Sequence, residues 1–235
     1  MTTEKKNTTI SIHQPNYLPW LGYFYKIYQA DIFVFLDDAQ FSNQGMHNYT
    51  YIKTATGPYR LKHPVRQSLG DKINEVRSKD ELGWKEKHLS ILELNYRDAR
   101  YFDLVFNDYK SIILNSFPDI AALNISLIQF FSARLGINSR FERSPEMCKD
   151  LIKSDKIIAI CKVLGGNIYY SGTGAKSYQN EENFISSGIE LSYSNYRPFF
   201  YPQLWSGFQS NITALDFFMN CGYDWDRVLR SQEQY

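Results

Sequence analysis

Polar side chains follow two apolar runs near the start of the sequence. Residues 9–12 form the first run and segment 31–38 carries the second, with a helix-like stretch at 21–28 between them. A strand, a helix and a strand in this order predict a βαβ unit of a parallel sheet. The polar residues at the two ends are His13, Gln14 and Asn16, and Asp37, Asp38 and Gln40. Ligands gather at the carboxyl ends of such strands, so these residues form the first candidate site.

The histidine and the two carboxylates of this group suit acid–base chemistry. His13 can act as an acid, a base or a phosphate donor near neutral pH, or it can simply close a turn through hydrogen bonds. Asp37 and Asp38 can bind a metal, orient a base or accept sugar hydroxyls. Neighbouring side chains alternate along a strand, so at most one of the two faces the pocket if the strand persists. We expect no metal, because His13, His47, His63 and His88 lack ligand spacing.

A second candidate segment, residues 171–177, follows a predicted strand and precedes a helix. Gly172 and Gly174 let backbone N–H groups turn toward an anion, and Lys176 adds a positive charge. The segment is not a P-loop, because Ala175 and Tyr170 stand where that motif has glycines. It is either a phosphate cradle or a plain strand-to-helix turn.

Aromatic residues are abundant, with 18 Tyr, 16 Phe and 4 Trp. The ring-rich segment 196–205 is either a stacking platform for a base or sugar, or a loop that packs its rings on the sheet edge. Cys161 lies on the predicted buried face of a helix, so we do not expect it to act as a nucleophile.

The elements that position these residues predict an α/β fold with a mostly parallel sheet, a β-hairpin and a central helical block. Residues 1–8 are expected to be a flexible N-terminus, and 9–235 a single domain with the helical block at about 83–136. Further strands are predicted at 49–53, 59–65, 140–143, 167–171 and 189–193, with a hairpin turn at 56–58 and an irregular stretch at 66–80. Further helices are predicted at 83–96, 104–117, 120–131, 154–164, 181–186 and 211–220, the third starting at Pro118-Asp119.

Composition narrows the class of protein. The net charge is +1, from 26 basic and 25 acidic residues, whereas nucleic-acid binders usually carry a basic face, so no nucleic-acid partner is expected. Three cysteines without paired spacing predict reduced thiols. The polar start shows no secretory signal and no stretch is long enough to span a membrane, so the expectation is a cytoplasmic protein without a membrane partner.

Longer motifs resemble a known family. The opening segment 13–24 (HQPNYLPWLGYF) and segment 36–42 (LDDAQFS) are similar to the signature of the WbqC-like proteins. The similarity extends over residues 10–223. Its further motifs are Asn48, 52–54, 84–88, 99–102, 135–137, 170–172, 174–175, Tyr178, 201–203 and 220–222. The chain departs from the pattern at residues 49–51, where basic residues are expected, and at Thr173, where a proline is expected.

The resemblance implies a function in bacterial surface-polysaccharide (O-antigen, lipopolysaccharide) biosynthesis. It implies a transferase that moves a glycyl or aminoacyl group to the amino group of a nucleotide-linked sugar such as dTDP-4-amino-4,6-dideoxyglucose. The alternatives are an ATP-dependent ligase of HUP-like type and a non-catalytic nucleotide-sugar binding protein. The donor is open between a carrier-protein thioester, an aminoacyl-adenylate and an aminoacyl-tRNA, of which the near-neutral net charge disfavours the tRNA. ATP is a further possible co-substrate, and no other cofactor or oligomeric state is assigned.

Such a reaction needs a base, donors for an oxyanion and an anion site. His13 is the predicted base, oriented by Asp37 or Asp38, and Asn16, Gln40 and Asn48 are the predicted oxyanion donors. The remaining predicted substrate-binding residues are Gln14, Tyr17, Lys53, Ser171, Gly172, Gly174, Lys176, Tyr178, Tyr201 and Gln203.

Overall fold

The computed structural model describes residues 7–144, 147–176 and 179–233. Contacts divide the chain into two compact units. Unit 1 comprises Met1–Gln14, Tyr25–Asp38 and Ile137–Tyr196, and unit 2 comprises Pro15–Phe24, Ala39–Gly136 and Arg197–Tyr235. Helix α1 (Leu21–Tyr28) begins in unit 2 and ends in unit 1.

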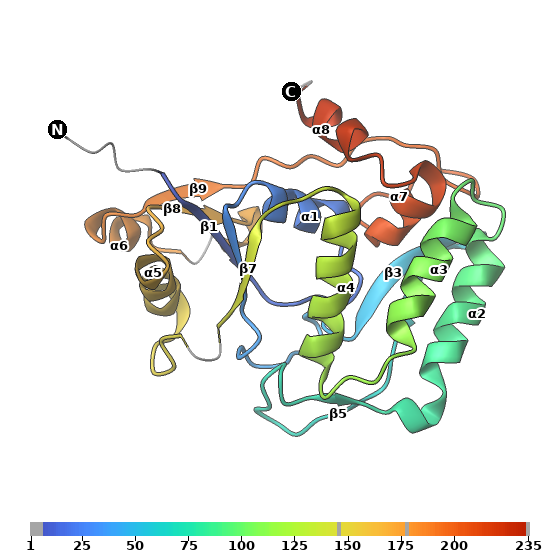
Figure 1. Ribbon diagram of the computed structural model, residues 1–235, viewed down its shortest axis with the longest axis horizontal. Coiled ribbons are helices and arrows are strands. Elements are labelled where there is room, and N and C mark those ends of the chain that lie inside the picture. The colour runs from blue at the N-terminus through green and yellow to red at the C-terminus, as the bar shows by residue number, and fades with distance from the viewer. Residues whose placement is uncertain (1–6, 145–146, 177–178, 234–235) are drawn as a thin grey trace. The chain divides into compact units, whose positions relative to one another are not determined.

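Unit 1 is built on a parallel sheet. Within the described residues the sheet has five strands in the order β7-β2-β1-β8-β9, and every neighbouring pair is parallel. The strands are β1 (Thr9–His13), β2 (Ile32–Phe35), β7 (Arg140–Arg143), β8 (Ile168–Ser171) and β9 (Glu190–Tyr193). Helices α5 (Lys153–Val163) and α6 (Glu181–Ser186) link the last three strands (Figure 1). Strand β1 therefore lies between β2 and β8, which brings the ends of these three strands together.

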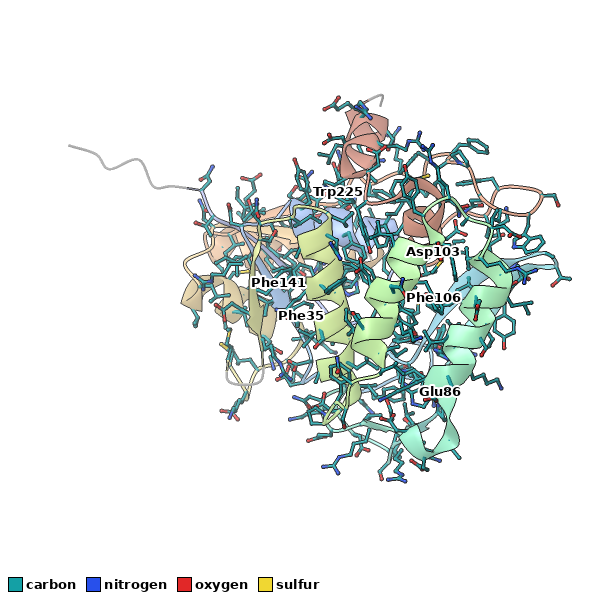
Figure 2. All side chains as sticks on the ribbon, turned by 45° about the vertical axis from the view of Figure 1, so that its right-hand side comes forward. Phe35, Glu86, Asp103, Phe106, Phe141 and Trp225 are labelled. Atoms are coloured by element: carbon teal, nitrogen blue, oxygen red, sulfur yellow. The ribbon has the colours of Figure 1, made fainter. Side chains whose placement is uncertain are left out.

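Both faces of this sheet are apolar, as expected for parallel strands covered on two sides. Ile32 and Val34 of β2 pack into a core that α5 and α6 complete with residues such as Ile160 and Phe184. The alternate residues of β2 face the other way: the ring of Phe35 stacks on Phe141, with centroids 5.5 Å apart (Figure 2). This alternation fixes the register of β2.

Unit 2 contains the hairpin and the helical block. The hairpin pairs β3 (Tyr49–Thr54) with β4 (Gly57–Lys62), and a shorter pair joins β5 (Val65–Arg66) to β6 (Arg77–Ser78). A 3₁₀ turn, Asp80–Leu82, precedes α2 (Trp84–Tyr96), α3 (Phe102–Ile113) and α4 (Ile120–Arg134), which lie side by side (Figure 1). The remaining helices are α7 (Ala214–Cys221), which packs on α3, and α8 (Trp225–Glu233).

The predicted fold class is confirmed, including the parallel sheet, the hairpin and the helical block. Helix α4 shows why local sequence was sufficient to predict where a helix begins and ends. Asp119 caps its first turn by accepting from the Ala122 backbone N–H at 2.8 Å, as its position predicted. Gly136 follows the helix at φ +70°, a conformation that glycine adopts without strain.

Three local predictions are wrong, and one helix was missed. Thr54 pairs with Gly57, so the hairpin turn is Ala55 and Thr56 rather than 56–58. Segment 66–80 contains pairing strands, and Thr173–Ala175 forms a 3₁₀ turn rather than an open loop. Helix α8 was not predicted, because it buries only Trp225 and Val228, too few residues for a visible period. No helix among the described residues is long and apolar enough to cross a membrane.

Candidate functional site

The carboxyl end of β1 presents His13 as a half-buried side chain. Its Nδ1 lies 2.9 Å from the backbone carbonyl oxygen of Gln14. A carbonyl only accepts, so in the neutral ring Nδ1 carries the hydrogen and Nε2 carries the lone pair. The ring is therefore held in the tautomer in which Nε2 is the basic nitrogen.

The carboxylate of Asp37 lies just beyond β2 and is fully buried. Its Oδ2 accepts from the guanidinium of Arg143, whose Nε is 2.7 Å away and which ends β7. Its Oδ1 has no hydrogen-bond partner within the described part of the chain. Burial raises the pKa of Asp37, although the hydrogen bonds from Arg143 act in the opposite direction.

The neighbouring carboxylate, Asp38, has different partners. Ser144 donates to its Oδ1 at 2.6 Å, and the Lys156 ammonium pairs with its Oδ2. Burial alone would raise the pKa of Asp38, but the hydrogen bonds from Lys156 and Ser144 outweigh it and hold that pKa below its usual value. Two adjacent carboxylates with opposite shifts are typical of sites that divide acid–base roles.

Asp37 is fully buried and Asp38 is half-buried, so the two side chains do not divide into one buried and one exposed group as strand alternation would require. Alternation does not apply here because β2 ends at Phe35 and a turn follows. Sequence reasoning also missed their cationic partners. Arg143 ends a predicted strand, and Lys156 lies four residues before the buried Ile160 on α5, so both positions carried a detectable signal.

The third strand end carries the predicted phosphate cradle. Ser171 is buried and donates to Gln179 at 3.0 Å, whereas Lys176 is exposed with its ammonium 5.5 Å from the centroid of the Tyr193 ring. A Cβ at Gly172 or Gly174 would meet open space, and neither residue has a positive φ. Nothing in the local structure therefore requires glycine there. Tyr178 lies outside the described residues.

These strand ends meet at one edge of the sheet, which we call the carboxyl edge and define by His13, Asp37, Asp38, Arg143 and the loop 171–176. The four strands that carry them are neighbours in the order β7-β2-β1-β8. Adjacent strands lie about 4.8 Å apart. The edge thus gathers a basic nitrogen, two carboxylates and two cations at the ends of four neighbouring strands.

A buried lysine lies behind this edge. The ammonium of Lys26, on α1, donates to the backbone carbonyl oxygen of Ile12 at 2.8 Å, and the residue is only 5% exposed. Burial lowers the pKa of Lys26 to about 7. Sequence reasoning missed this residue, although a lysine inside the apolar segment 21–28 is itself a signal.

In unit 2, Tyr17 lies in a buried ring cluster. Its hydroxyl lies 2.9 Å from His88 Nδ1 and 2.6 Å from the Tyr109 hydroxyl. The Tyr17 ring packs edge-on against His63 at 4.9 Å between centroids. The residue is fully buried, which raises its pKa. The structure therefore places Tyr17 in the core of unit 2.

The predicted oxyanion donors differ from one another in their surroundings. Asn48 is fully buried and its Nδ2 donates to the His63 carbonyl at 2.8 Å, while its Oδ1 has no partner among the residues described. Asn16 is likewise buried with an unpartnered Oδ1. Gln40 is exposed and forms an isolated bridge with Lys72. The unpartnered atoms of Asn16 and Asn48 are acceptors, whereas an oxyanion needs donors.

Three other predicted residues gather around Asp216, which is fully buried in α7. Tyr201 and Gln203 donate to its Oδ1 at 2.9 and 2.8 Å, and Tyr96 donates to its Oδ2 at 2.9 Å. The Lys53 ammonium donates to the carbonyls of Trp205 and Gly207 and acts electrostatically on Asp216. Burial raises the pKa of Asp216 against these hydrogen bonds. This network joins strand β3 of the hairpin, the end of α2, the loop 201–207 and helix α7 within unit 2.

Substituting Asp216 with alanine is expected to lower the free energy of unfolding by about 3 to 5 kcal/mol, because it leaves buried donors without their acceptor. Urea denaturation at pH 7.5 measures the loss. The matched control is Asp103→Ala, an exposed position on α3 (Figure 2), with an expected loss of at most about 1 kcal/mol. Equal losses in the two variants would contradict the role given to the network.

One cleft of unit 2, with a volume of about 530 Å³, is lined by residues from three family motifs that are distant in sequence, 99–102, 201–203 and 220–222. Its lining includes Arg100, Tyr101, Gln203, Asn220 and Cys221. Gln203 and Asn220 are hydrogen-bonded within unit 2. Burial raises the pKa of Cys221, with Arg227 acting in the opposite direction, so this thiol is not an activated nucleophile. The same holds for Cys161, whose pKa burial raises to about 12.

Comparisons with known proteins agree with the motifs. The model of the WbqC-like protein family matches residues 14–227. A Mycobacterium tuberculosis (strain ATCC 25618 / H37Rv) protein, named Uncharacterized protein Rv1507c, is 31% identical over 227 residues, which cover 94% of this chain and 97% of that protein. No solved structure matches significantly. The family match and this relative, each covering most of the chain, show that the protein belongs to the WbqC-like protein family.

Proposed function

We propose that this protein is a transferase of bacterial polysaccharide biosynthesis that moves a glycyl or similar aminoacyl group to the amino group of a nucleotide-linked sugar. The observation that carries the proposal is the position of His13 at the end of β1, the middle strand of the parallel sheet. The loop 171–176 follows β8, the neighbour of β1 on one side, and Asp37 follows β2, the neighbour on the other side. Membership of the WbqC-like family supports the reaction class.

The geometry suits a nucleotide sugar whose diphosphate lies at the loop 171–176. The local fold does not require glycine at 172 and 174, but glycine there lets phosphates approach the backbone closely. Lys176 supplies a positive charge. The sugar then extends over β1 and β2, one or two strand spacings away. There the Asp37 carboxylate, which is fully buried, acts on the amine through its charge rather than by direct contact.

The proposed reaction is a nucleophilic acyl substitution. The sugar amine attacks the carbonyl carbon of the aminoacyl group, a C–N bond forms, and the bond to the leaving thiolate or phosphate breaks after a tetrahedral intermediate. His13 Nε2 takes the proton that the amine loses and passes it to the leaving group. Arg143 uses two of its N–H groups on Asp37, and its side chain is 46% exposed, so further donors are accessible to the developing oxyanion.

A mass-spectrometric assay tests the proposal directly. The protein is incubated with dTDP-4-amino-4,6-dideoxyglucose and, in separate reactions, a glycyl carrier-protein thioester, glycyl-adenylate, or glycine with ATP. A product heavier by one glycyl group, absent with dTDP-glucose, is the expected result. Product only with glycine and ATP, with ATP consumed, would make the protein a ligase. Binding of the sugar nucleotide without product from any donor would contradict a transferase and leave a binding protein.

Replacing Lys176 with alanine is expected to weaken binding of the nucleotide sugar about fivefold, since an exposed charge contributes up to about 1 kcal/mol. Titration calorimetry at low ionic strength measures the change. The control is Lys162→Ala, another exposed lysine, in the last turn of α5. An affinity equal to that of the control would place the phosphates elsewhere than at this loop.

A further inference from the structure

A cleft in unit 2 combines open space with buried polar atoms that lack partners. It lies where β3 begins and β4 ends, ahead of β5, and has a volume of about 420 Å³. Asn48 and His63 line it together with Asn43, Lys62 and Gln67. Asn48 and His63 are fully buried, yet Asn48 Oδ1 and His63 Nε2 have no hydrogen-bond partner in the described chain. Buried polar groups are normally satisfied. Neither atom has accessible surface, so a ligand in this cleft would complete them once the side chains that cover them shift.

The polarity of the two atoms restricts the ligand. The Nδ2 of Asn48 donates to the His63 carbonyl oxygen, which fixes the amide and leaves an oxygen that can only accept. Burial lowers the pKa of His63 to about 3, so its ring is neutral near pH 7 and Nε2 either donates or accepts, depending on the tautomer. A hydroxyl group satisfies both atoms in either case, because it donates to Asn48 and matches whichever state Nε2 adopts.

Charged ligands fit less well. A phosphate or carboxylate would place its oxygens against the acceptor of Asn48. An ammonium would lie near Lys62, whose charge already disfavours the protonated form of His63. The cleft therefore selects a neutral group with hydroxyls.

The ring of His63 is held in place before any ligand binds. The ring of His63 stacks on Trp84 with centroids 4.4 Å apart, and Tyr17 packs against its edge. The Trp84 indole N–H donates to Asp80 at 2.8 Å and so fixes the stack. Side chains held in place by packing bind at a lower entropic cost.

We propose that the cleft lined by Asn48 and His63 is a binding site for a neutral, hydroxyl-rich ligand, a sugar ring, built by unit 2 alone. The proposal does not depend on the acyl-transfer reaction. Asn48 Oδ1 accepts one sugar hydroxyl and His63 Nε2 bonds a second one.

Nitrogen NMR of the histidine rings tests the site in the full-length wild-type chain. The four histidines give few signals, and His63→Phe, which keeps a ring on Trp84 but removes Nε2, assigns that of His63. The probes are the methyl glycosides of glucose, galactose, mannose and N-acetylglucosamine, with inorganic phosphate and methylammonium as charged counterparts. At least one glycoside is expected to shift the His63 signal saturably at pH 7, whereas the charged probes leave it unchanged.

Variants provide the second measurement. Asn48→Leu, followed through the His63 signal, and His63→Phe, followed by titration calorimetry, are each expected to weaken the glycoside about tenfold, the effect of one lost hydrogen bond. Asn107→Leu, an exposed amide on α3, is the matched control and should bind as the wild type does. Two results would overturn the proposal: an unchanged His63 signal with every glycoside up to its solubility limit, which means that water fills the cleft, or a response to phosphate or methylammonium. The NMR titration of the wild-type chain tests the proposed site even if Asn48→Leu fails to fold.

Discussion

Substituting His13 with alanine is expected to lower the rate of aminoacyl transfer by about 10²- to 10⁴-fold, the usual contribution of a general base. The hydrogen bond from Nδ1 to the Gln14 carbonyl leaves the lone pair on Nε2, and the substitution removes that nitrogen. The measurement is kcat/KM in the mass-spectrometric assay with dTDP-4-amino-4,6-dideoxyglucose. Because the ring contributes a proton acceptor rather than affinity, the dissociation constant of the sugar nucleotide should change little.

Two further measurements separate a proton-transfer role from a structural one. Added imidazole should restore part of the rate of His13→Ala, since it supplies the missing base in the space left by the ring. His13→Gln keeps a hydrogen-bonding side chain but cannot carry a proton, so it should be as slow as the alanine variant. Full activity of His13→Gln would show that the side chain only closes a turn, the alternative that the sequence left open.

The free energy of unfolding is expected to fall steeply as the pH drops below about 6.5. Burial lowers the pKa of His47 and His88 to about 4 and that of His63 to about 3, from the usual 6.5. The unfolded chain therefore binds three protons that the folded chain excludes, and stability is complete above pH 6.5 and lost as the pH falls toward 4. Each bound proton contributes a slope of about 1.4 kcal/mol per pH unit, so three give up to about 4 kcal/mol per unit.

Urea midpoints measured from pH 7.5 to 4.5 check this dependence. Asp37 and Asp216, whose pKa values burial raises, take up protons in the folded state and offset part of the loss at the acid end. His63→Phe removes one of the three protons and should reduce the slope by about a third. A urea midpoint that stays constant between pH 6.5 and 4.5 would contradict the inference that the three buried histidines remain neutral in the folded chain.

Local sequence predicted most of the elements for a physical reason. Helix α1 and strand β7 have the predicted bounds, because apolar periodicity and turn residues act within a few positions. The parallel order of β1 and β2 followed from the strand–helix–strand spacing alone. The motifs at 13–24 and 36–42 were sufficient for the family, since they are long and rich in rare residues.

The pairing of charges was decided only by the tertiary structure. Arg143 is 106 residues from Asp37, and Lys156 is 118 residues from Asp38. Tyr96 and Asp216 are 120 residues apart. Sequence reasoning assigned Tyr201 and Gln203 to a pocket. The structure bonds both to this buried carboxylate, and Gln203 also lines the cleft of about 530 Å³.

The sequence by itself thus determined the fold class, the family and the strand ends at which His13, Asp37 and Asp38 lie. The tertiary structure decided what surrounds each of these groups. Residue type and local spacing fix secondary structure and the direction of a strand. A carboxylate's pKa, an amide's free acceptor and a histidine's tautomer instead depend on burial and on partners that the folding of distant segments brings within a few ångströms.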